Sequence, residues 1–265
     1  MGIASAGTWL RQGLEGFLSL VYPEVCALCR EHPAGVQEGF VCGPCRSAVQ
    51  RVLPPFCERC GLPPSGEVSG RHACAHCRDF RPPFESARAA LIAKGPVLDV
   101  LHRFKYRGEL WFEPFLRDPF LSAAVPALCS DAWTGLVPVP LHPVKERERE
   151  FNQAEILGRP LARALGIPME CRLVRRTLPT VTQTRLSREE RAENMRDAFQ
   201  PHPSARRIQG DWIVVDDVFT TGATSGAVAR VLLELGARKV VVWSVARATL
   251  EGGLLPEDAW ESPGS

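Results

Sequence analysis

The sequence predicts an α/β fold, in which a parallel sheet is flanked by helices and preceded by a small cysteine-rich module. Apolar, strand-like segments alternate with helical segments through the second half of the 265-residue chain, and this alternation is typical of parallel sheets with helices on both faces. Eight of the ten cysteines form four CxxC pairs before residue 82. The composition, 45% hydrophobic and 23% charged, is that of an ordinary globular protein.

Four segments are expected along the chain. They are an N-terminal amphipathic helix over 1–25, the cysteine-rich module over 26–82, the α/β domain over 83–250 and a loose tail over 251–265. The chain has no run of about 18 apolar residues, so we expect no membrane span. Its first 25 residues lack the basic start of a signal peptide, which favours a cytoplasmic location.

The CxxC pairs predict two zinc sites. Each pair can present two thiolates from one turn, and two such turns form a tetrahedral four-thiolate site. The simplest arrangement joins neighbouring pairs into a double zinc ribbon, although an interleaved pairing stays open. The metal ligands would then be Cys26, Cys29, Cys42 and Cys45 at one site and Cys57, Cys60, Cys74 and Cys77 at the other. Disulfides are disfavoured without an export signal, and the remaining Cys129 and Cys171 are expected in the core.

The charge of the chain argues against a broad nucleic-acid surface. The whole chain has a net charge of only +2. Residues 26–82 contain seven Arg, no Lys and five acidic residues, so eight thiolates and two Zn²⁺ leave this module at −2. A net negative module is a poor partner for the phosphate backbone. The module is therefore more consistent with a structural or protein-docking role.

The elements of the α/β domain follow from its apolar runs and its Gly and Pro residues. Strands are expected over 86–94, 134–141, 171–177, near 199, over 211–218 and over 238–248. Helices are expected from Pro96 to about 110, over 109–125 with interruptions at Pro114 and Pro119, over 151–166, and over 224–237 with Gly236 as the cap. Residues 178–199 form a long, polar and highly charged segment.

Two adjacent acids, Asp216 and Asp217, stand where the strand over 211–218 ends, and a loop rich in hydroxyl groups follows. Parallel sheets bind ligands at the carboxyl ends of their strands, and the N–H groups of a loop that opens a helix form an anion site. Gly222 lets the backbone approach such an anion, and threonine hydroxyls lie on both sides of it. A phosphate on the loop and a vicinal diol on the acids together indicate a ribose 5-phosphate. The alternative is an ordinary strand–turn–helix with an Asp N-cap.

The string "VVDDVFTTGAT" resembles the phosphoribosyl pyrophosphate (PRPP) signature of type I phosphoribosyltransferases. The segments "LHRFKYRGEL", "LVPVPLHPVKEREREFNQAEILGRPLA" and "TQTRLSREERAENMRDAF" resemble the ComF family of competence proteins, which includes GntX-like proteins. The resemblance covers about residues 20 to 250. It implies a double zinc ribbon followed by a type I phosphoribosyltransferase-like domain, and a part in natural competence.

The resemblance also implies roles for individual residues. Asp216 and Asp217 would be the catalytic acids that hold the ribose diol, with Mg²⁺ accompanying PRPP. The 5-phosphate would bind to Thr220, Thr221, Gly222, Ala223 and Thr224. The pyrophosphate and flexible-loop contacts would come from Lys105, Arg107, Lys145, Arg147, Arg149, Gln183, Thr184, Arg185, Ser187 and Arg188.

Other readings of these basic and amide residues stay open. The alternating charges of 145–150 also fit a solvated helix face. Asn152 and Gln153 either position the loop or begin the helix. The chain departs from the family at two positions, where Glu150 and Arg185 stand in place of the usual glycines.

The implied reaction is displacement of pyrophosphate from the ribose anomeric carbon by a nitrogen nucleophile, with an unknown acceptor. Two alternatives do not need turnover. One is a component of DNA uptake that senses PRPP or a nucleotide, and the other is a competence protein that binds single-stranded DNA. A DNA-uptake helicase or single-stranded DNA would then be the partner.

Overall fold

The computed structural model of the chain describes residues 25–64, 66, 70, 72–79, 81–178 and 198–249. All but the last residue of the expected N-terminal helix over 1–25 lies outside the described residues, and so does the tail over 251–265. The same holds for the flexible-loop candidates Gln183, Thr184, Arg185, Ser187 and Arg188. For these segments the expectations above stay predictions.

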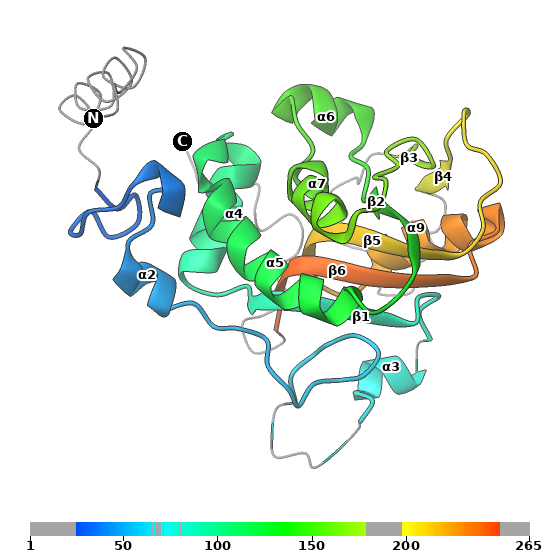
Figure 1. The fold of residues 1–265 in the computed structure, drawn as a ribbon, viewed down its shortest axis with the longest axis horizontal. Helices are drawn as coiled ribbons and strands as arrows, with labels where there is room; N and C mark the ends of the chain where they lie inside the picture. Colours follow the sequence, from blue (N-terminus) through cyan, green and yellow to red (C-terminus); the bar gives the residue numbers. More distant parts are fainter. Residues whose placement is uncertain are drawn as a thin grey trace, which may run out of the picture.

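A four-stranded parallel sheet forms the centre of the described chain (Figure 1). Its strands are β1 (Ser86–Ile92), β6 (Lys239–Arg247), β5 (Asp211–Phe219) and β2 (Trp133–Pro138), which lie in this order across the sheet and pair in parallel throughout. Two short strands, β3 (Val174–Arg176) and β4 (Phe199–Pro201), form a separate antiparallel pair. The predicted parallel sheet is confirmed.

Helices cover both faces of this sheet. On one face lie α4 (Pro96–Tyr106), α5 (Glu113–Leu128, preceded by η2, Leu110–Phe112) and α7 (Gln153–Leu165), and on the other lies α9 (Ala223–Leu235). Along β5 the side chains alternate between these two cores, because successive residues of a strand point to opposite faces. Ile213 and Val215 belong to the core with α4, α5 and α7, whereas Trp212 and Val214 belong to the core with α9.

The predicted interruptions at Pro114 and Pro119 are wrong, because α5 continues through both positions. Pro114 occupies the first turn of α5. Backbone N–H groups in the first turn have no hydrogen-bond partner within the helix, so the missing N–H group of a proline costs nothing there. Pro119 lies inside the helix, where a proline removes a hydrogen bond. Phe115, Leu116 and Phe120 are buried on the sheet side, and this packing outweighs the lost bond.

The two cysteine segments lie at different places on the molecule. In Figure 1 the first, which contains η1 (Val36–Glu38) and α2 (Gly43–Ser47), lies beside α4. The second, which contains α3 (Ala75–Asp79), lies below β1. Cys57, Cys60 and Cys77 are part of the same buried cluster as Phe84, Phe219 and the residues of α9. The second segment therefore completes the core on that face of the sheet.

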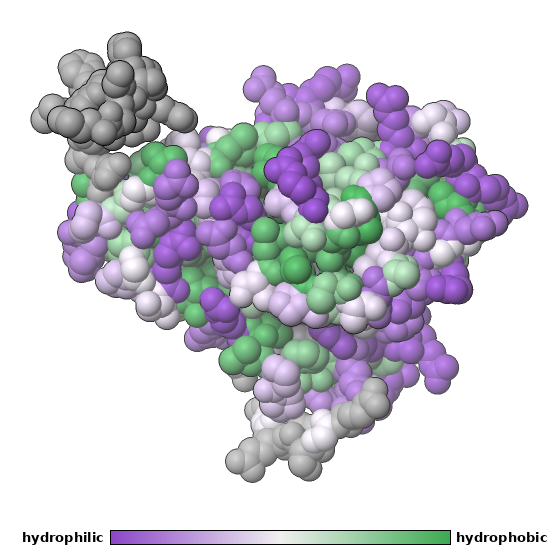
Figure 2. All heavy atoms as spheres, viewed as in Figure 1, coloured by the Kyte–Doolittle hydropathy of each residue, from purple (hydrophilic) through white to green (hydrophobic). Residues whose placement is uncertain are grey.

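Two further expectations concern exposure. Cys129 and Cys171 are exposed, so the expectation that they lie in the core is wrong. Cys129 follows the last residue of α5, and Cys171 lies in the turn before β3. The remaining helix, α6 (Pro143–Arg149), has no buried residue and is covered by hydrophilic side chains at the top of the view in Figure 2. None of the helices in the described part of the chain has both the length and the hydrophobicity needed to cross a bilayer.

Candidate functional site

A pocket lies at the carboxyl ends of β2 and β5, with a volume of about 140 Å³. The elements that surround it are the end of α4, the β2–α6 connection, α6, the start of α7, and the loop that joins β5 to α9. Its lining residues are Lys105, Tyr106, Val139, Pro140, Leu141, Lys145, Arg149, Asn152, Gln153, Ala154, Arg176, Asp216, Asp217, Val218, Phe219, Thr220, Gly222, Thr224 and Ser225. The sheet edge predicted to bind a ligand is therefore hollowed.

The two adjacent acids straddle the end of β5. Asp217 continues the side-chain row of Ile213 and Val215 and reaches α4, where its Oδ2 lies 2.7 Å from Lys105 Nζ. Asp216 lies on the opposite row and reaches α9, where its Oδ2 accepts a hydrogen bond from the Ser225 hydroxyl at 3.4 Å. Because each carboxylate has its own partner, two like charges can stand next to each other in the chain.

Lys105 is held in its charged form. Burial alone would lower the pKa of this lysine, but the Asp217 carboxylate outweighs it, so the net shift of the Lys105 pKa is upward. The ammonium therefore lies beside the acid in the lining of the pocket. Lys105 was expected at the pyrophosphate, and the structure places its side chain on Asp217.

The loop after β5 has the geometry expected of an anion site. Gly222 is the N-cap of α9 and has φ of +83°, a left-handed conformation that favours glycine. A Cβ at this position would lie 2.6 Å from the Phe219 ring, so only glycine fits. The cap residue is a glycine, which excludes the reading of an Asp N-cap.

Only part of the predicted phosphate loop faces the pocket. Thr220, Gly222 and Thr224 line it. The hydroxyl of Thr221 instead accepts a hydrogen bond from the Ala223 N–H at 3.3 Å, which braces the turn from within. Ala223 begins α9, so these two residues shape the turn between β5 and α9, and neither lines the pocket.

The basic residues of α6 separate into two groups. Lys145 and Arg149 line the pocket, and the Arg149 guanidinium lies 4.7 Å from the centre of the Tyr106 ring. Arg147 is exposed on the far side of the helix and does not line the pocket, and neither does the exposed Arg107. The lining of the pocket therefore includes two cations from α6.

Asn152 and Gln153 stand at the start of α7. The Asn152 side chain accepts a hydrogen bond from the Ala154 N–H and donates one to the Val139 carbonyl, both at 3.0 Å. It therefore both begins the helix and positions the connection. Gln153 is only 2% exposed, and its buried Nε2 makes no hydrogen bond with any described residue. Because it lines the pocket, this amide is a donor available to a ligand.

Glu150 ends α6 with φ of +62°, a left-handed conformation that costs a non-glycine residue about 1–2 kcal/mol. A glycine at this position would adopt the same conformation without that cost. We expect Glu150→Gly to raise the free energy of unfolding by about 0.5–1 kcal/mol, after the larger entropy of glycine in the unfolded chain is subtracted. Urea unfolding measures this gain. Glu150→Ala removes the same charge without relieving the backbone, so an equal gain from Ala would contradict the explanation.

Three polar lining residues were missed by the sequence interpretation: Tyr106, Arg176 and Ser225. Ser225 is 1% exposed and lies one residue beyond the predicted loop. Its position in the first turn of a helix that follows the acids could have identified it. Arg176 belongs to β3, and its guanidinium lies over the Phe199 ring of β4. No local motif indicates that this short strand pair reaches the pocket.

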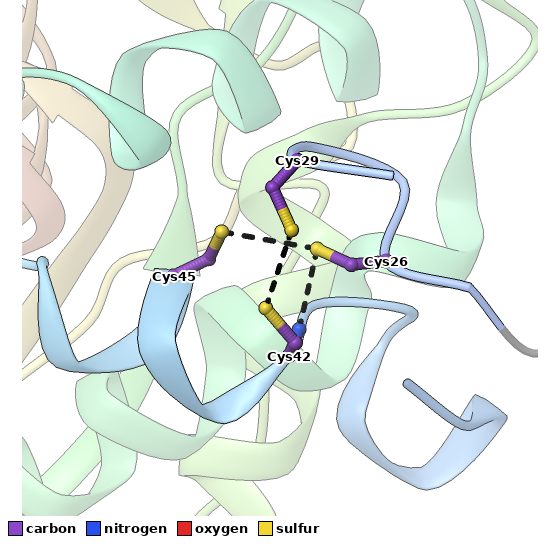
Figure 3. Close-up of side chains that lie close together, drawn as sticks. All are labelled: Cys26, Cys29, Cys42 and Cys45. Atoms are coloured by element: carbon purple, nitrogen blue, oxygen red, sulfur yellow. Dashed lines mark hydrogen bonds between the residues drawn. The ribbon is translucent and has the colours of Figure 1, made fainter. Parts of the chain in front are cut away.

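The cysteines form two tetrads of neighbouring pairs, in which all four sulfur atoms lie within 4.8 Å of one another. In the first tetrad, shown in Figure 3, the Cys26–Cys45 and Cys29–Cys42 sulfur distances are 3.8 and 3.6 Å. In the second, Cys60 and Cys74 are 3.6 Å apart. A tetrahedral zinc site with Zn–S bonds of about 2.3 Å requires sulfur atoms about 3.8 Å apart. Both tetrads therefore fit Zn²⁺.

Each tetrad contains one thiol that ionises readily. A backbone hydrogen bond from Glu31, assisted by His32, lowers the pKa of Cys29 to about 5. Burial opposes ionisation of Cys57, but backbone hydrogen bonds from Cys60 and Cys74 outweigh it and lower the Cys57 pKa to about 7. Since thiolates are the form that binds metal, each tetrad has a ligand ready near neutral pH.

Comparison with known proteins gives matches over both parts of the chain. A family model described as a double zinc ribbon domain matches residues 17–78. A DNA utilization protein, YhgH of Salmonella typhi, is 32% identical over 235 residues, which cover 86% of this chain and 99% of the relative. Competence protein F of Haemophilus influenzae is 28% identical, covering 84% of this chain and 96% of the relative.

Two further matches cover less of this chain. Competence protein ComFC of Bacillus subtilis is 30% identical over 204 residues, which cover 74% of this chain and 79% of the relative. Among solved structures, an adenine phosphoribosyltransferase aligns with 66% of this chain and 98% of its own, at 18% identity and a TM-score of 0.33. This structural likeness is too low to support an argument about the site.

Proposed function

Since the chain belongs to the ComF family of competence and DNA-utilization proteins, we propose that it binds PRPP with Mg²⁺ in this pocket and acts in DNA uptake during natural transformation. Relatives that cover most of the chain carry the names competence protein and DNA utilization protein, which supports the second part. The reduced thiols of the tetrads suit a cytoplasmic location.

One observation carries the first part: the two acids straddle the end of β5 beside a glycine-capped helix N-terminus. A helix N-terminus and its loop favour a phosphate, and carboxylates accept hydrogen bonds from hydroxyl groups. A ligand that carries a phosphate and a vicinal diol a few atoms apart is a ribose 5-phosphate. Lys145 and Arg149, on the other side of the pocket, suit the pyrophosphate of PRPP.

In a transfer reaction the chain's own residues would act by placement and charge. The acids orient the ribose, the loop holds the 5-phosphate, and Lys145 with Arg149 offsets charge that develops on the departing pyrophosphate. Mg²⁺, when bound, neutralises pyrophosphate oxygens, and the carboxylates of Asp216 and Asp217 are the oxygen ligands that this ion prefers. No side-chain nucleophile is required.

Calorimetric titration with a set of sugars tests the proposal. We expect ribose 5-phosphate to bind. Ribose lacks the phosphate that contacts the loop, and 2-deoxyribose 5-phosphate lacks one of the two hydroxyl groups. Both of these sugars should therefore bind at least about tenfold more weakly than ribose 5-phosphate. PRPP should bind more tightly with Mg²⁺ than with a chelator. Equal binding of all three sugars would contradict the proposal.

Gln153→Met is expected to separate binding from stability. It removes the buried Nε2, which has no hydrogen-bond partner among the described residues, while keeping the volume of the side chain, so the chain should be about as stable as the native form. PRPP should bind about tenfold more weakly, because a hydrogen bond to a charged phosphate is lost. Titration and thermal unfolding measure the two effects. Unchanged affinity would remove Gln153 from the ligand contacts.

Release of pyrophosphate separates a transferase from a component that only senses PRPP. Incubation of the chain with PRPP, Mg²⁺ and candidate bases or amines should release pyrophosphate if the chain is a transferase. Binding without release for every acceptor would favour the sensing function. Single-stranded DNA binding is the less favoured alternative, because the cysteine module would carry net negative charge.

A further inference from the structure

We infer that Arg247 couples the second cysteine tetrad to the phosphate loop, so that an intact metal site at Cys57, Cys60, Cys74 and Cys77 supports tight binding of the 5-phosphate. The inference rests on the proposed function. It assigns to Arg247, which lies at the end of β6 and does not line the pocket, the role of a positioning residue.

Arg247 is a buried cation between the second tetrad and the loop that follows β5. It is 5% exposed. Its Nη2 lies 3.8 Å from the Cys60 sulfur, while its Nη1 donates hydrogen bonds to the carbonyls of Phe219, at 2.9 Å, and Thr220. A single guanidinium therefore contacts the metal-binding cluster as well as the last residue of β5 and the first residue of the loop.

The charge of the tetrad explains why an arginine is stable here. A four-thiolate site that holds one Zn²⁺ has a net charge of −2, and an unpaired buried cation is costly. The guanidinium is the counterion of this site, and its fixed fork provides several N–H donors in one plane. Loss of the metal would release the four cysteines from one another, and with them the fixed position of the Cys60 sulfur beside the guanidinium.

The contacts with Phe219 and Thr220 orient the loop. In a trans peptide the carbonyl and the following N–H point in opposite directions. By holding the carbonyls of residues 219 and 220 from the side of the tetrad, Arg247 turns the N–H groups of Thr220 and Thr221 away from it. The N–H groups of such a loop are the donors that a phosphate needs.

Packing reinforces this connection. The Arg247 guanidinium lies 4.7 Å from the centre of the Phe219 ring, and Phe219 packs edge-on against Phe84 at 5.9 Å. The same Phe219 ring lies directly against Gly222, where a Cβ would come within 2.6 Å of it. A shift of Arg247 or of the cysteine cluster would therefore move Phe219 and, with it, Gly222, where the loop turns into α9.

The first test measures the coupling from the metal side in the native chain. A chromophoric chelator competes for the two zinc ions at equilibrium, with and without saturating ribose 5-phosphate. Because the coupling of two binding free energies is reciprocal, ribose 5-phosphate should raise the affinity for one of the two ions about tenfold and leave the affinity for the other unchanged. If calorimetry shows that the sugar binds but neither zinc affinity changes, or both change equally, the inference is wrong.

Arg247→Lys tests the contact itself. Lysine keeps the charge beside the tetrad but cannot hold Cys60 and both carbonyls at once. We expect two zinc ions to be retained, ribose 5-phosphate to bind about tenfold more weakly, and the effect of the sugar on the affinity for one zinc ion to disappear. Arg88→Met is the control, because Arg88 is a half-buried cation near Cys57 and Cys60 whose guanidinium contacts the Ala87 carbonyl and the Phe56 ring rather than the loop. The affinity of this variant for the sugar should match that of the native chain.

Hydrogen exchange keeps this inference separate from the proposed function, since it needs no ligand. In the zinc-loaded chain, the amides of residues 220–224 should exchange about tenfold faster in Arg247→Lys than in the native chain or in Arg88→Met. Unchanged exchange in Arg247→Lys would overturn the inference even if the sugar binds. Faster exchange without any sugar binding would support the coupling and contradict the proposed function.

Discussion

Asp216→Asn combined with Asp217→Asn is expected to weaken PRPP binding at least about 100-fold. A hydrogen bond to a charged group contributes about 1.5–3 kcal/mol, so two carboxylates that accept from the ribose diol contribute about 3 kcal/mol or more, and each 1.4 kcal/mol is a factor of about ten. Titration of native and variant chains with PRPP and Mg²⁺ measures the loss.

The single variants control for damage to the fold. Asp217→Asn leaves the buried Lys105 ammonium without its carboxylate, which costs up to about 3–5 kcal/mol of stability. Asp216→Asn keeps a side-chain oxygen that can accept from the Ser225 hydroxyl or the Asp217 N–H, so it should fold about as stably as the native chain. It should still bind PRPP about tenfold more weakly. Native affinity in a correctly folded Asp216→Asn variant would contradict the role of this acid.

Loss of the second zinc site is expected to destabilise the chain more than loss of the first. Cys57, Cys60 and Cys77 are buried in the core shared with α9, whereas Cys26 and Cys42 form a small cluster with Ala34. Structural zinc contributes about 10–16 kcal/mol of apparent binding free energy, and in the second tetrad this energy is linked to the main core.

Cys60→Ser and Cys29→Ser form a matched pair for this test. Each should reduce the zinc content from two ions to one per chain. Cys60→Ser should lower the melting temperature by about 10 °C, on the basis of about 3 kcal/mol or more of lost stability and the usual scaling for a chain of this size, and Cys29→Ser by less. Equal losses in the two variants would show that the second tetrad is not part of the main core. One zinc ion in the native chain would contradict the two-site arrangement.

The sequence interpretation succeeded where the pattern is local. The runs that gave β5, β6, α7 and α9 are apolar segments bounded by Gly or Pro, and Gly166 and Gly236 end their helices in the left-handed conformation as expected of caps. The tetrads follow from CxxC spacing in the same way. The site acids and their loop were found because one continuous string contains them.

Contacts between distant segments could not be predicted in this way. Nothing near Lys105 in the sequence indicates that it pairs with Asp217, because the pair depends on how α4 packs across β5. In the sequence, Arg247 is only a polar residue at the end of a predicted strand. Its role depends on its contacts with Cys60 and Thr220, which are distant from it in the chain. The continuity of α5 through Pro119 likewise depends on burial of its apolar side chains, which a local proline rule does not include.

The most direct test of the binding site is a crystal structure of the zinc-loaded chain with PRPP and Mg²⁺. The phosphate attached to the ribose should lie on the backbone of residues 220–224, with the two ribose hydroxyls on Asp216 and Asp217 and the pyrophosphate toward Lys145 and Arg149. A ligand bound elsewhere, or a diol that does not contact either acid, would contradict the proposed site.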